Sequence, residues 1–398
     1  MTATATRGAT PEARKLPAIR VETVSDYQAF LDLAPAWSEA VKAAGIDHPF
    51  LEHAWLRTWW ECFAASSTLH IVLVKESDDI VAIAPLISTR LRMFGIPVRR
   101  LGFFYNDHVP RAGFIVTRHP VRQPEDVYQA IWDHLLSERD SWDLLQLCQL
   151  PEGSPTLEEM RRLAGEAGFA SGEWLSGASP YVCMGTSWNR YYDGLATKHR
   201  SNLRNRFKRL NQTGLVGVET VTAKECLPDA MEAGLRLEES AWKRDAGTAI
   251  SCDPQVRTFY ETFACRAAEK SWLRLNFLKA GAQRIAFDYS LAYNHQVFLL
   301  KLGYDPAFSA FSPSNLLLSM GLERTFEQGF AKYDFLGENA DWKNCWAKDE
   351  TRNYWLFVFA GSFKGRCLHF IKFRVVPWLK NSWVKKIVIA SRIMKAKI

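Results

Sequence analysis

The sequence predicts a mixed α/β (α+β) fold of two tandem units, each a mixed and mostly antiparallel sheet flanked by helices. Length is the first reason, because 398 residues exceed what a single hydrophobic core usually holds. The second is pattern: alternating apolar segments of strand length recur in both halves, with helix-like segments between them. Composition agrees, since a hydrophobic fraction of 47% with 15 Trp and 24 Phe is typical of a folded protein with an aromatic-rich interior.

The first half alternates helices and strands. An apolar hairpin is predicted from Leu69–Lys75 and Ile80–Ser88, which flank the polar turn Ser77–Asp79. A helix is predicted over Val24–Ala44 with Ser25 as its N-cap. The other expected elements are helices at 53–63, 125–139 and 156–168 and strands at 99–104, 113–116 and 143–148.

The second half repeats a similar order of elements, without a repeat at the level of residues. Its most informative part is a strand pair, Ala286–Tyr293 and Gln296–Gly303, followed by a helix over Pro313–Gln328 and a short strand at Tyr333–Leu336. The other expected elements are helices at 188–210, 223–243 and 256–270 and strands at 216–222, 273–279 and 352–360.

These elements suggest a division of the chain. Residues 1–17 are small, polar and Pro-containing and are predicted to be disordered. Residues 18–180 form the expected first unit and residues 181–365 the second, with the Gly- and Ser-rich segment 172–187 as the crossing between them. Residues 366–398 form a basic amphipathic tail.

Charge is unevenly distributed along the chain. After Glu350 there are 11 Lys and Arg and no acidic residue, which leaves 39 basic and 43 acidic residues in the rest of the protein. Basic segments that carry Trp and aliphatic residues commonly lie on anionic membrane surfaces, and packing onto the body of the protein is the alternative. A nucleic-acid role has less support, because no nucleic-acid-binding motif is present.

The cysteines and the N-terminus indicate a compartment. Eight cysteines are scattered without a CxxC pair or a His/Cys cluster at zinc spacing, which predicts reduced thiols and no metal. The N-terminus lacks the apolar segment of a secretory signal, and no run of about 18 apolar residues predicts a membrane span. We therefore expect a cytoplasmic protein, peripheral on the inner face of the cell membrane.

The helix predicted at Pro313 starts directly after a loop of Asp, Pro and Ser. Ser312 is a preferred N-cap, Pro313 is tolerated in the first turn, and Gly329 suits the position after the last turn. A helix N-terminus presents unpaired N–H groups and partial positive charge, so it suits phosphate or pyrophosphate. An ordinary connecting helix is the alternative.

Four motifs in order carry a family resemblance: HRSNLRNRFKRL (199–210), LEESAWKRDAGT (237–248), LGYDPAFSAFSPSNLL (302–317) and YDFLGENADWKNCW (333–346). Together they resemble the CelD/BcsL-type GNAT N-acyltransferases, which are similar to the FemAB peptidyltransferases, and among them a lipid-amine acylating member of bacterial ceramide synthase type. The resemblance covers most of residues 20–365 and is strongest in the second half. It implies acyl-CoA as co-substrate and direct attack by an amine, without a covalent enzyme intermediate.

The resemblance places the donor at the start of the 313–328 helix. The candidate donor-binding residues there are Ser312, Ser314, Asn315 and Leu316. GNAT proteins usually carry a Gly-rich loop at this point, and this chain does not, so a carrier-protein thioester stays open beside CoA. Lys343 is a further candidate for holding a phosphate, with an ion pair to Glu338 as the alternative.

The helix at 188–210 carries a basic face. Arg200, Arg204 and Lys208 recur at every fourth residue and are candidates for phosphate contact, with a solvated face as the alternative. His199 falls on the apolar stripe of the same helix, where it is either a catalytic base or a core residue.

Acyl transfer to an amine needs a proton acceptor. The candidates are Asp334 and Glu338 near the 333–336 strand, and Glu239 in the helix-end motif that also contains Glu238, Trp242 and Lys243. Such a carboxylate could act as a base if burial raised its pKa. The alternatives are structural: Asp334 could cap the next loop, and Glu239 could form an ion pair with Lys243. Tyr304 and Asp305 match the family pattern just before the donor loop, and Tyr304 completes the catalytic candidates.

One polar loop of the first half is also a candidate. Tyr105–His108 follows a predicted strand and has the character of an acceptor-site loop, with a surface turn as the alternative.

These features predict transfer of an acyl group from a CoA or carrier thioester to an amine of an envelope lipid, of sphingoid type, or of a saccharide precursor. The tail is the sequence feature that favours the lipid. Two alternatives stay open: a FemAB-like transfer from aminoacyl-tRNA to a peptidoglycan precursor, and a non-catalytic membrane-associated scaffold. The absence of a sustained heptad pattern counts against the first alternative, and the unusual donor loop favours the second.

Overall fold

The computed structural model describes residues 18–64, 66–118, 122–239 and 250–379. The first half follows the predicted order. Its strands are β1 (Ile19–Val24), β2 (Ser67–Glu76), β3 (Asp79–Met93), β4 (Ile96–Phe103), β5 (Ile115–Val116) and β6 (Leu144–Pro151). Its helices are α1 (Tyr27–Asp32), α2 (Ala34–Ala44), α3 (His53–Phe63), α4 (Pro124–Ser137) and α5 (Pro155–Glu166).

The second half contains the predicted strand pair and the helix that follows it. Its strands are β7 (Ala170–Cys183), β8 (Val216–Val221), β9 (Leu273–Ala280), β10 (Gln283–Tyr293), β11 (Gln296–Tyr304), β12 (Lys332–Asp334) and β13 (Asp349–Phe359). Its helices are α6 (Trp188–Asp193), α7 (Thr197–Asn211), α8 (Leu227–Glu239), α10 (Pro254–Glu269), α11 (Pro313–Glu327), α12 (Asp341–Asn344) and α13 (Phe363–Phe370). The end of the helix predicted over 223–243 lies outside the described residues.

Two predicted helices are broken in the structure. The helix expected at 24–44 is wrong, because residues up to Val24 form β1 and two helices follow, with the carboxylate of Asp26 as the cap instead of Ser25. Pro35 in the first turn of α2 lacks the N–H that a continuous helix needs. The helix expected at 188–210 is interrupted at Gly194, which ends α6 before α7 begins.

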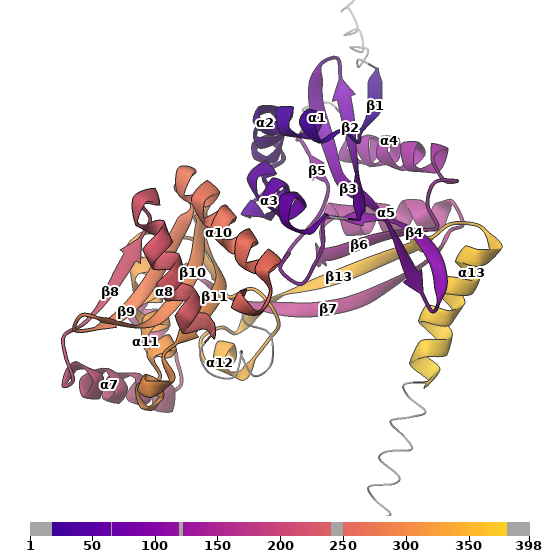
Figure 1. The fold of residues 1–398 in the computed structure, drawn as a ribbon. Coiled ribbons are helices and arrows are strands. Elements are labelled where there is room, and N and C mark those ends of the chain that lie inside the picture. The colour runs from indigo at the N-terminus through magenta and orange to yellow at the C-terminus, as the bar shows by residue number, and fades with distance from the viewer. Residues whose placement is uncertain (1–17, 65, 119–121, 240–249, 380–398) are drawn as a thin grey trace, which may run out of the picture.

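Most of the segment 172–187, where the crossing between the two units was expected, belongs to the long strand β7. Within the described ranges, thirteen strands form one sheet in the order β1-β2-β3-β4-β6-β13-β7-β12-β11-β10-β9-β8, with β5 beside β3 (Figure 1). The expected unit boundary at 180/181 falls inside β7, and β13 pairs with both β6 and β7. The central pair β7–β13 therefore joins the sheets of both halves.

Side chains also join the halves. The indole of Trp55 on α3 packs edge-on against Phe259 and Phe263 of α10, with ring centroids 5.1 and 4.7 Å apart. Arg111, from the first half, forms a buried ion pair with Asp334 at the end of β12, with Nη2 and Oδ2 2.5 Å apart. An aromatic core and a buried charge pair thus fix the loops of the first half beside the strand ends of the second.

Candidate active site

Strands β11 and β12 part after a short parallel pairing. The register runs from Gln296↔Lys332 to Phe298↔Asp334, where β12 ends while β11 continues to Tyr304. Just beyond, β11 contains a β-bulge against β10, because Tyr289 pairs with Lys301 but Ser290 pairs with Leu299. Leu300 is the extra residue, and a bulge of this kind removes a residue from the regular ladder.

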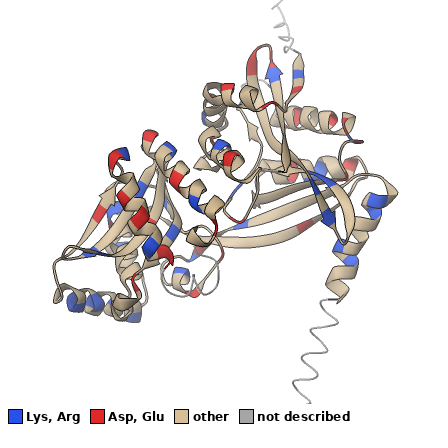
Figure 2. Ribbon diagram, viewed as in Figure 1, with Lys and Arg blue, Asp and Glu red and all other residues tan. Residues whose placement is uncertain are grey.

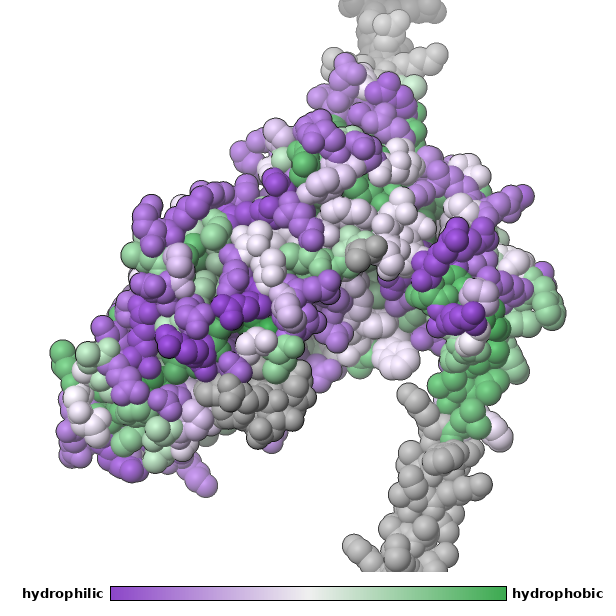
Figure 3. All heavy atoms as spheres, viewed as in Figure 1, coloured by the Kyte–Doolittle hydropathy of each residue, from purple (hydrophilic) through white to green (hydrophobic). Residues whose placement is uncertain are grey.

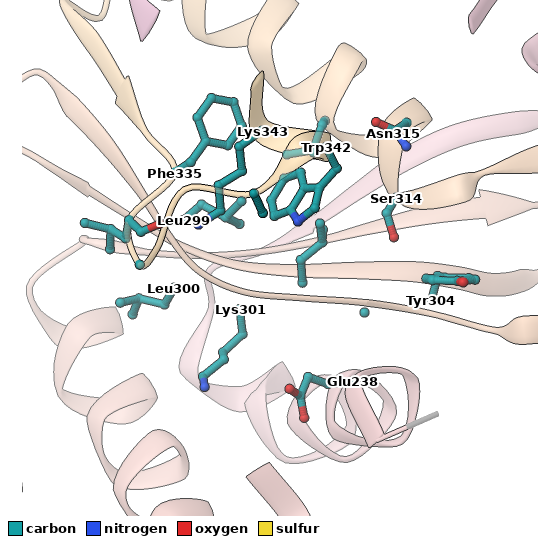
Figure 4. Close-up of a pocket in the computed structure, with 16 residues that line it drawn as sticks. Glu238, Leu299, Leu300, Lys301, Tyr304, Ser314, Asn315, Phe335, Trp342 and Lys343 are labelled. Atoms are coloured by element: carbon teal, nitrogen blue, oxygen red, sulfur yellow. Dashed lines mark hydrogen bonds between the residues drawn. The ribbon is translucent and has the colours of Figure 1, made fainter. Parts of the chain in front are cut away.

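A cavity of about 490 Å³ lies where the strands part (Figure 4). One wall is the β11 segment Leu299–Tyr304, and the opposite wall is formed by Phe335–Gly337 and the start of α12. Ser314 and Asn315, from the first turn of α11, close one end. We call this the donor cavity, after the role that we propose for it below. Tyr304, Ser314, Asn315 and Lys343 are the sequence-predicted site residues that line it.

The first turn of α11 is built differently from the expectation. Pro313 begins the helix as predicted, but Ser312 has a left-handed backbone with φ of 46° and its side chain makes no capping hydrogen bond. Asn315 accepts a hydrogen bond from the indole N–H of Trp346, over 3.3 Å. Leu316 packs into the core instead of the cavity. No acidic residue lies in this turn, so the partial positive charge of the helix end is retained.

Lys343 has internal partners. Its ammonium donates to the carbonyl oxygens of Leu336 and Glu338, at 2.5 and 2.7 Å. Burial lowers the pKa of Lys343 to about 8, while the carboxylates of Asp334 and Glu338 act in the opposite direction. Lys343 therefore fixes the 336–338 loop, which forms part of the cavity wall.

A second cavity, of about 630 Å³, adjoins the first. The two share Leu300, Lys301, Leu336 and Gly337 as lining residues. The second cavity is formed by both halves of the chain, and we call it the acceptor cavity, after the role that we propose for it below. Its side chains combine aromatic rings with polar groups; they include Tyr105, Asp107, His108, Gln149, Trp174, Ser176, Tyr260, Glu338, Asn353 and Trp355.

Three residues of the polar loop Tyr105–His108 line this second cavity: Tyr105, Asp107 and His108. The His108 ring nitrogen Nδ1 is 3.3 Å from the Tyr260 hydroxyl, and the Lys301 ammonium lies 5.1 Å from the centroid of the Tyr260 ring. Burial, with a smaller effect of Lys301, lowers the pKa of His108 to about 4, so the imidazole is neutral at physiological pH.

Asp334 lies outside both cavities. Its carboxylate is 0% exposed, and besides Arg111 it is 3.2 Å from the Lys332 ammonium and accepts a hydrogen bond from the Leu336 backbone N–H at 3.0 Å. These contacts use both oxygens. The geometry fits a residue that fixes the strand end and the loop after it.

His199 lies on α7, behind the donor cavity. Its ring meets the indole of Trp346 edge-on with 4.6 Å between centroids, and that indole holds Asn315. Burial is the main cause that lowers the pKa of His199, with Arg206 as the second. His199 thus supports the cavity wall and does not line either cavity.

The basic residues of α7 point elsewhere. Arg200 pairs with Asp193 over 2.9 Å, and Arg204 is exposed beside a shallow groove that also contains Phe207. Figure 2 shows α7 as an almost continuous basic helix at one end of the molecule. Neither arginine lines the donor cavity.

The two glutamates at the end of α8 differ in position. Glu238 is buried, lines the donor cavity and accepts a hydrogen bond from the Ile250 backbone N–H at 2.9 Å, whereas Glu239 is only half-buried and lines neither cavity. Gly303 explains the placement, since a Cβ there would lie 2.5 Å from the Glu238 Cα. The sequence analysis selected Glu239 as the candidate. Gly303 in β11 was the feature that could have pointed to Glu238 instead, because a glycine allows the helix to approach the strand closely at that residue. Trp242 and Lys243 lie outside the described residues.

Among the described residues there is no group of three His, Cys, Asp or Glu side chains that could hold a metal ion. In the same ranges, no helix has the length and apolar character needed to cross a membrane.

Comparison with known proteins agrees with this geometry. Residues 197–344, which contain the donor cavity, match the model of the acetyltransferase (GNAT) domain family. This part of the chain is a GNAT acyltransferase domain. No curated protein sequence matches the chain.

Solved structures resemble most of the fold of this chain. A crystal structure of FemX matches with a TM-score of 0.55 at 10% identity, covering 80% of this chain and 95% of that one. A conserved protein of unknown function from Bacteroides thetaiotaomicron matches with 0.53 at 8% identity, covering 85% and 100%. The C-terminal domain of a putative lysylphosphatidylglycerol synthetase from Agrobacterium fabrum matches with 0.50 at 12% identity, covering 85% and 95%. At these identities the likeness concerns the fold, a tandem GNAT-like arrangement.

Proposed function

We propose that this protein transfers an acyl group from a thioester, of coenzyme A or of a carrier protein, to the amine of an envelope lipid or saccharide precursor. The observation that carries the proposal is the meeting of two cavities at Leu300 and Lys301, where β11 and β12 part. One cavity belongs to a GNAT domain and ends at a helix N-terminus whose first turn lacks acidic residues, so its partial positive charge suits a phosphate-bearing donor. The other is lined by both halves and suits the acceptor.

In this reaction the amine nitrogen attacks the thioester carbonyl, the new C–N bond forms and the C–S bond breaks. The amine proton leaves to a base, and the thiolate takes up a proton. Ser314, Asn315 and Tyr304 would contact the donor, which supplies the activated acyl group. The bulge at Leu300 lies at the junction, where a backbone N–H would stabilise the developing oxyanion.

Glu338 is the proposed proton acceptor. Among the expected catalytic carboxylates it is the one in the acceptor cavity, and its neighbour Gly337 lines both cavities. Glu338→Gln should lower kcat by about 10²–10⁴-fold, the usual contribution of general base catalysis. Binding of acyl-CoA should be unchanged. Glu350→Gln, at another exposed carboxylate, is the control, and a kcat for Glu338→Gln within threefold of wild type would remove Glu338 from this role.

The donor is tested by thermal unfolding with acetyl-CoA, palmitoyl-CoA, free CoA and no ligand. A ligand that binds the folded state at about 100 times its Kd stabilises by about 2.7 kcal/mol, which raises the Tm measurably. A larger shift with palmitoyl-CoA than with CoA supports a lipid acyltransferase. No shift with any of the three contradicts CoA as donor and favours a carrier thioester or the scaffold alternative.

The C-terminal helix supports an acceptor held at a membrane. It runs from Phe363 through a π-helical turn at Ile371–Val375 to Leu379. Phe363, Phe370 and Trp378 are 84%, 58% and 66% exposed, and hydrophobic residues gather over this helix in Figure 3. Its charged residues are all basic. Exposed apolar and basic side chains on one helix suit an anionic bilayer surface, on the inner face of the cell membrane.

The same helix adjoins the acceptor cavity. The Lys372 ammonium lies 5.0 Å from the centroid of the Trp174 ring, and Trp174 lines that cavity. A lipid acceptor would therefore reach the cavity from the surface that the helix contacts. The remaining tail residues, 380–398, lie outside the described residues.

Vesicle co-sedimentation tests this part of the proposal. The protein should bind vesicles of phosphatidylcholine and phosphatidylglycerol, less so as salt rises, and should not bind vesicles of phosphatidylcholine alone. Phe370→Glu should weaken binding. Phe94→Glu, at another exposed phenylalanine (48% exposed) in the β3–β4 turn, is the matched control. Equal binding of the two variants would contradict a docking role for this helix.

The basic helix α7 is also compatible with a second candidate function. A helix of this charge would also suit the phosphates of an aminoacyl-tRNA donor, as in the FemAB-like alternative. Loss of the activity on RNase treatment would establish that donor instead of an acyl-CoA.

A further inference from the structure

Helix α7 carries a charge that neither cavity uses. Six of its 15 residues are Lys or Arg and none is acidic (Figure 2). Within the described part of the chain, only one of the six forms an ion pair, Arg200 with Asp193. Arg200, Arg204 and Lys208 recur at every fourth residue, where like charges are neighbours on the helix surface and destabilise it. A negatively charged partner would offset this repulsion.

A groove of about 260 Å³ lies beside this charge, between α6, α7 and α11. Four of its aromatic and apolar residues are half-exposed or exposed, so a partner can reach them: Trp188, Tyr192, Phe207 and Met320. Arg204 and Glu323 also line the groove, one charge of each sign. The exposed Lys208 and Arg209 of α7 therefore make the surface around the groove basic.

The groove and the donor cavity lie on two sides of α11. Ser314 and Asn315 line the cavity, whereas Met320 lines the groove. The guanidinium of Arg209 lies 5.3 Å from the ring centroid of Phe311, in the turn that leads into α11. A single helix, about 10–12 Å across with its side chains, thus separates the groove from the donor cavity. A phosphopantetheine arm is long enough to pass around it.

An acidic amphipathic helix is the partner that these features fit. A helix docks into an apolar groove through one face, and acidic residues beside that face would meet Arg204, Lys208 and Arg209. RNA phosphates would also neutralise the basic side chains, but RNA offers no aliphatic surface to fill the groove. The position beside the turn before α11 indicates a partner that delivers the donor.

Resting on the proposed function, we infer that the donor is the thioester of an acidic acyl carrier protein, and that α7 and the adjoining groove are the surface on which one helix of the carrier docks. The docked carrier extends its phosphopantetheine arm past the first turn of α11 into the donor cavity. Attack by the amine then releases the carrier as a free thiol. A CoA thioester has the same arm and enters the same cavity, but it lacks the contacts that the carrier makes with α7.

The test uses isothermal titration calorimetry on the full-length protein with two ligands that share one arm. The first is a bacterial acyl carrier protein loaded with an octanoyl group, and the second is octanoyl-pantetheine, which is uncharged. Wild-type protein should bind the loaded carrier at least about tenfold more tightly at low salt, equivalent to about 1.4 kcal/mol. This preference should shrink as the salt concentration rises.

The variants decide the assignment. Arg204→Glu combined with Lys208→Glu should weaken carrier binding at least about tenfold and leave the Kd of octanoyl-pantetheine within about twofold. Phe207→Ser removes an apolar contact without a change of charge and should weaken carrier binding by a smaller factor, so it decides the test if the double variant fails to fold. Lys42→Glu combined with Arg90→Glu makes the same charge change at exposed sites of the first half and should leave both Kd values unchanged.

Three results would overturn the inference: no carrier binding by wild type, carrier binding that is equal in wild type and both α7 variants, or an equal loss of octanoyl-CoA binding in the double variant, which would assign α7 to the nucleotide. Binding of tRNA that depends on Arg204 and Lys208, in a protein that does not bind the carrier, would assign α7 to RNA instead. Carrier binding as expected, but without amide formation on any amine, would contradict the proposed function alone.

Discussion

The two halves of the sheet each contain one parallel strand pair, and the two pairs behave differently. In the first half, β4 and β6 pair from Arg100↔Leu144 to Gly102↔Gln146, and a Cβ on Gly102 would lie 2.5 Å from the Gln146 carbonyl oxygen. Those strands stay in close contact. In the second half, β11 and β12 pair over an equally short segment and then part around the donor cavity.

The helices after these strands differ in charge. Helix α4, between β4 and β6, has Glu125 and Asp126 in its first turn, whereas α11, between β11 and β12, has no acidic residue there. Negative charge at a helix N-terminus stabilises the helix but repels a phosphate. Equivalent topology therefore does not by itself create a cavity: β11 and β12 part around one, and the first turn of the helix between them lacks acidic residues.

The largest expected effect comes from breaking the ion pair between the halves. Arg111→Met leaves the Asp334 carboxylate buried beside Lys332 alone, and such a change typically costs about 3–5 kcal/mol of unfolding free energy. Chemical denaturation measures it. Arg162→Met, in an exposed pair with Glu159 and Glu166, should change stability by less than about 0.5 kcal/mol. Similar values for the two variants would contradict the linking role of Arg111.

Gly303→Ala tests the close approach of α8 to β11. The new Cβ would meet the Glu238 backbone nitrogen at 2.6 Å, so the helix must shift at a cost of about 3 kcal/mol, and donor binding should weaken because Glu238 lines the cavity. Gly321→Ala in α11, where no atom lies within 4 Å, serves as the control. A stable Gly303→Ala variant with unchanged CoA affinity would contradict this packing.

The buried carboxyl of Asp288 distinguishes β10 from β3, whose central residues are apolar. Burial raises the pKa of Asp288 to about 6, against hydrogen bonds from Ser290 and Asn276 that lower it. A raised carboxyl pKa contributes stability that is complete below about pH 3.8 and is lost as pH rises through 6. The free energy of unfolding of Asp288→Asn should therefore exceed that of wild type by about 3 kcal/mol at pH 8, and the two values should converge near pH 4. Exposed Asp78→Asn should show no such pH dependence, and a constant difference for Asp288→Asn from pH 4 to 8 would contradict the assignment.

The smallest expected effect makes the start of α11 resemble that of α4. Asn315→Asp retains an oxygen that accepts from Trp346 but adds a negative charge, which should weaken acetyl-CoA binding about tenfold, or about 1.4 kcal/mol. Isothermal titration calorimetry measures the Kd. Glu125→Gln in α4 should leave it unchanged. An Asn315→Asp variant with wild-type affinity would show that the donor phosphates lie elsewhere.

Local elements could be predicted because their signals are local. Helix α3 begins and ends where the sequence predicted, and the β10–β11 hairpin followed by α11 was confirmed, because alternation, turn residues and Pro313 act within a few residues. Ser312 was the expected N-cap, but its backbone is left-handed and its side chain makes no capping hydrogen bond.

The candidate site was predictable only in part. Ser314 and Asn315, expected at the donor, and Tyr304, expected as a catalytic residue, all line one cavity. Asp334 could not be judged from its own motif, because the guanidinium that neutralises it comes from residue 111, on the other half of the chain. For the same reason the walls contributed by β7 and β13 were missed, since these strands meet only in three dimensions.

The position of β13 also determines the order in which the protein can be completed during synthesis. A ribosome delivers β6 and β7 long before residue 349, yet both strands face β13 in the finished sheet. Until β13 emerges, each has an edge whose backbone groups await a partner, and such edges invite pairing with other chains. A gene cut at residue 180, where the sequence suggests a natural boundary, would therefore yield a fragment with an open edge prone to aggregation.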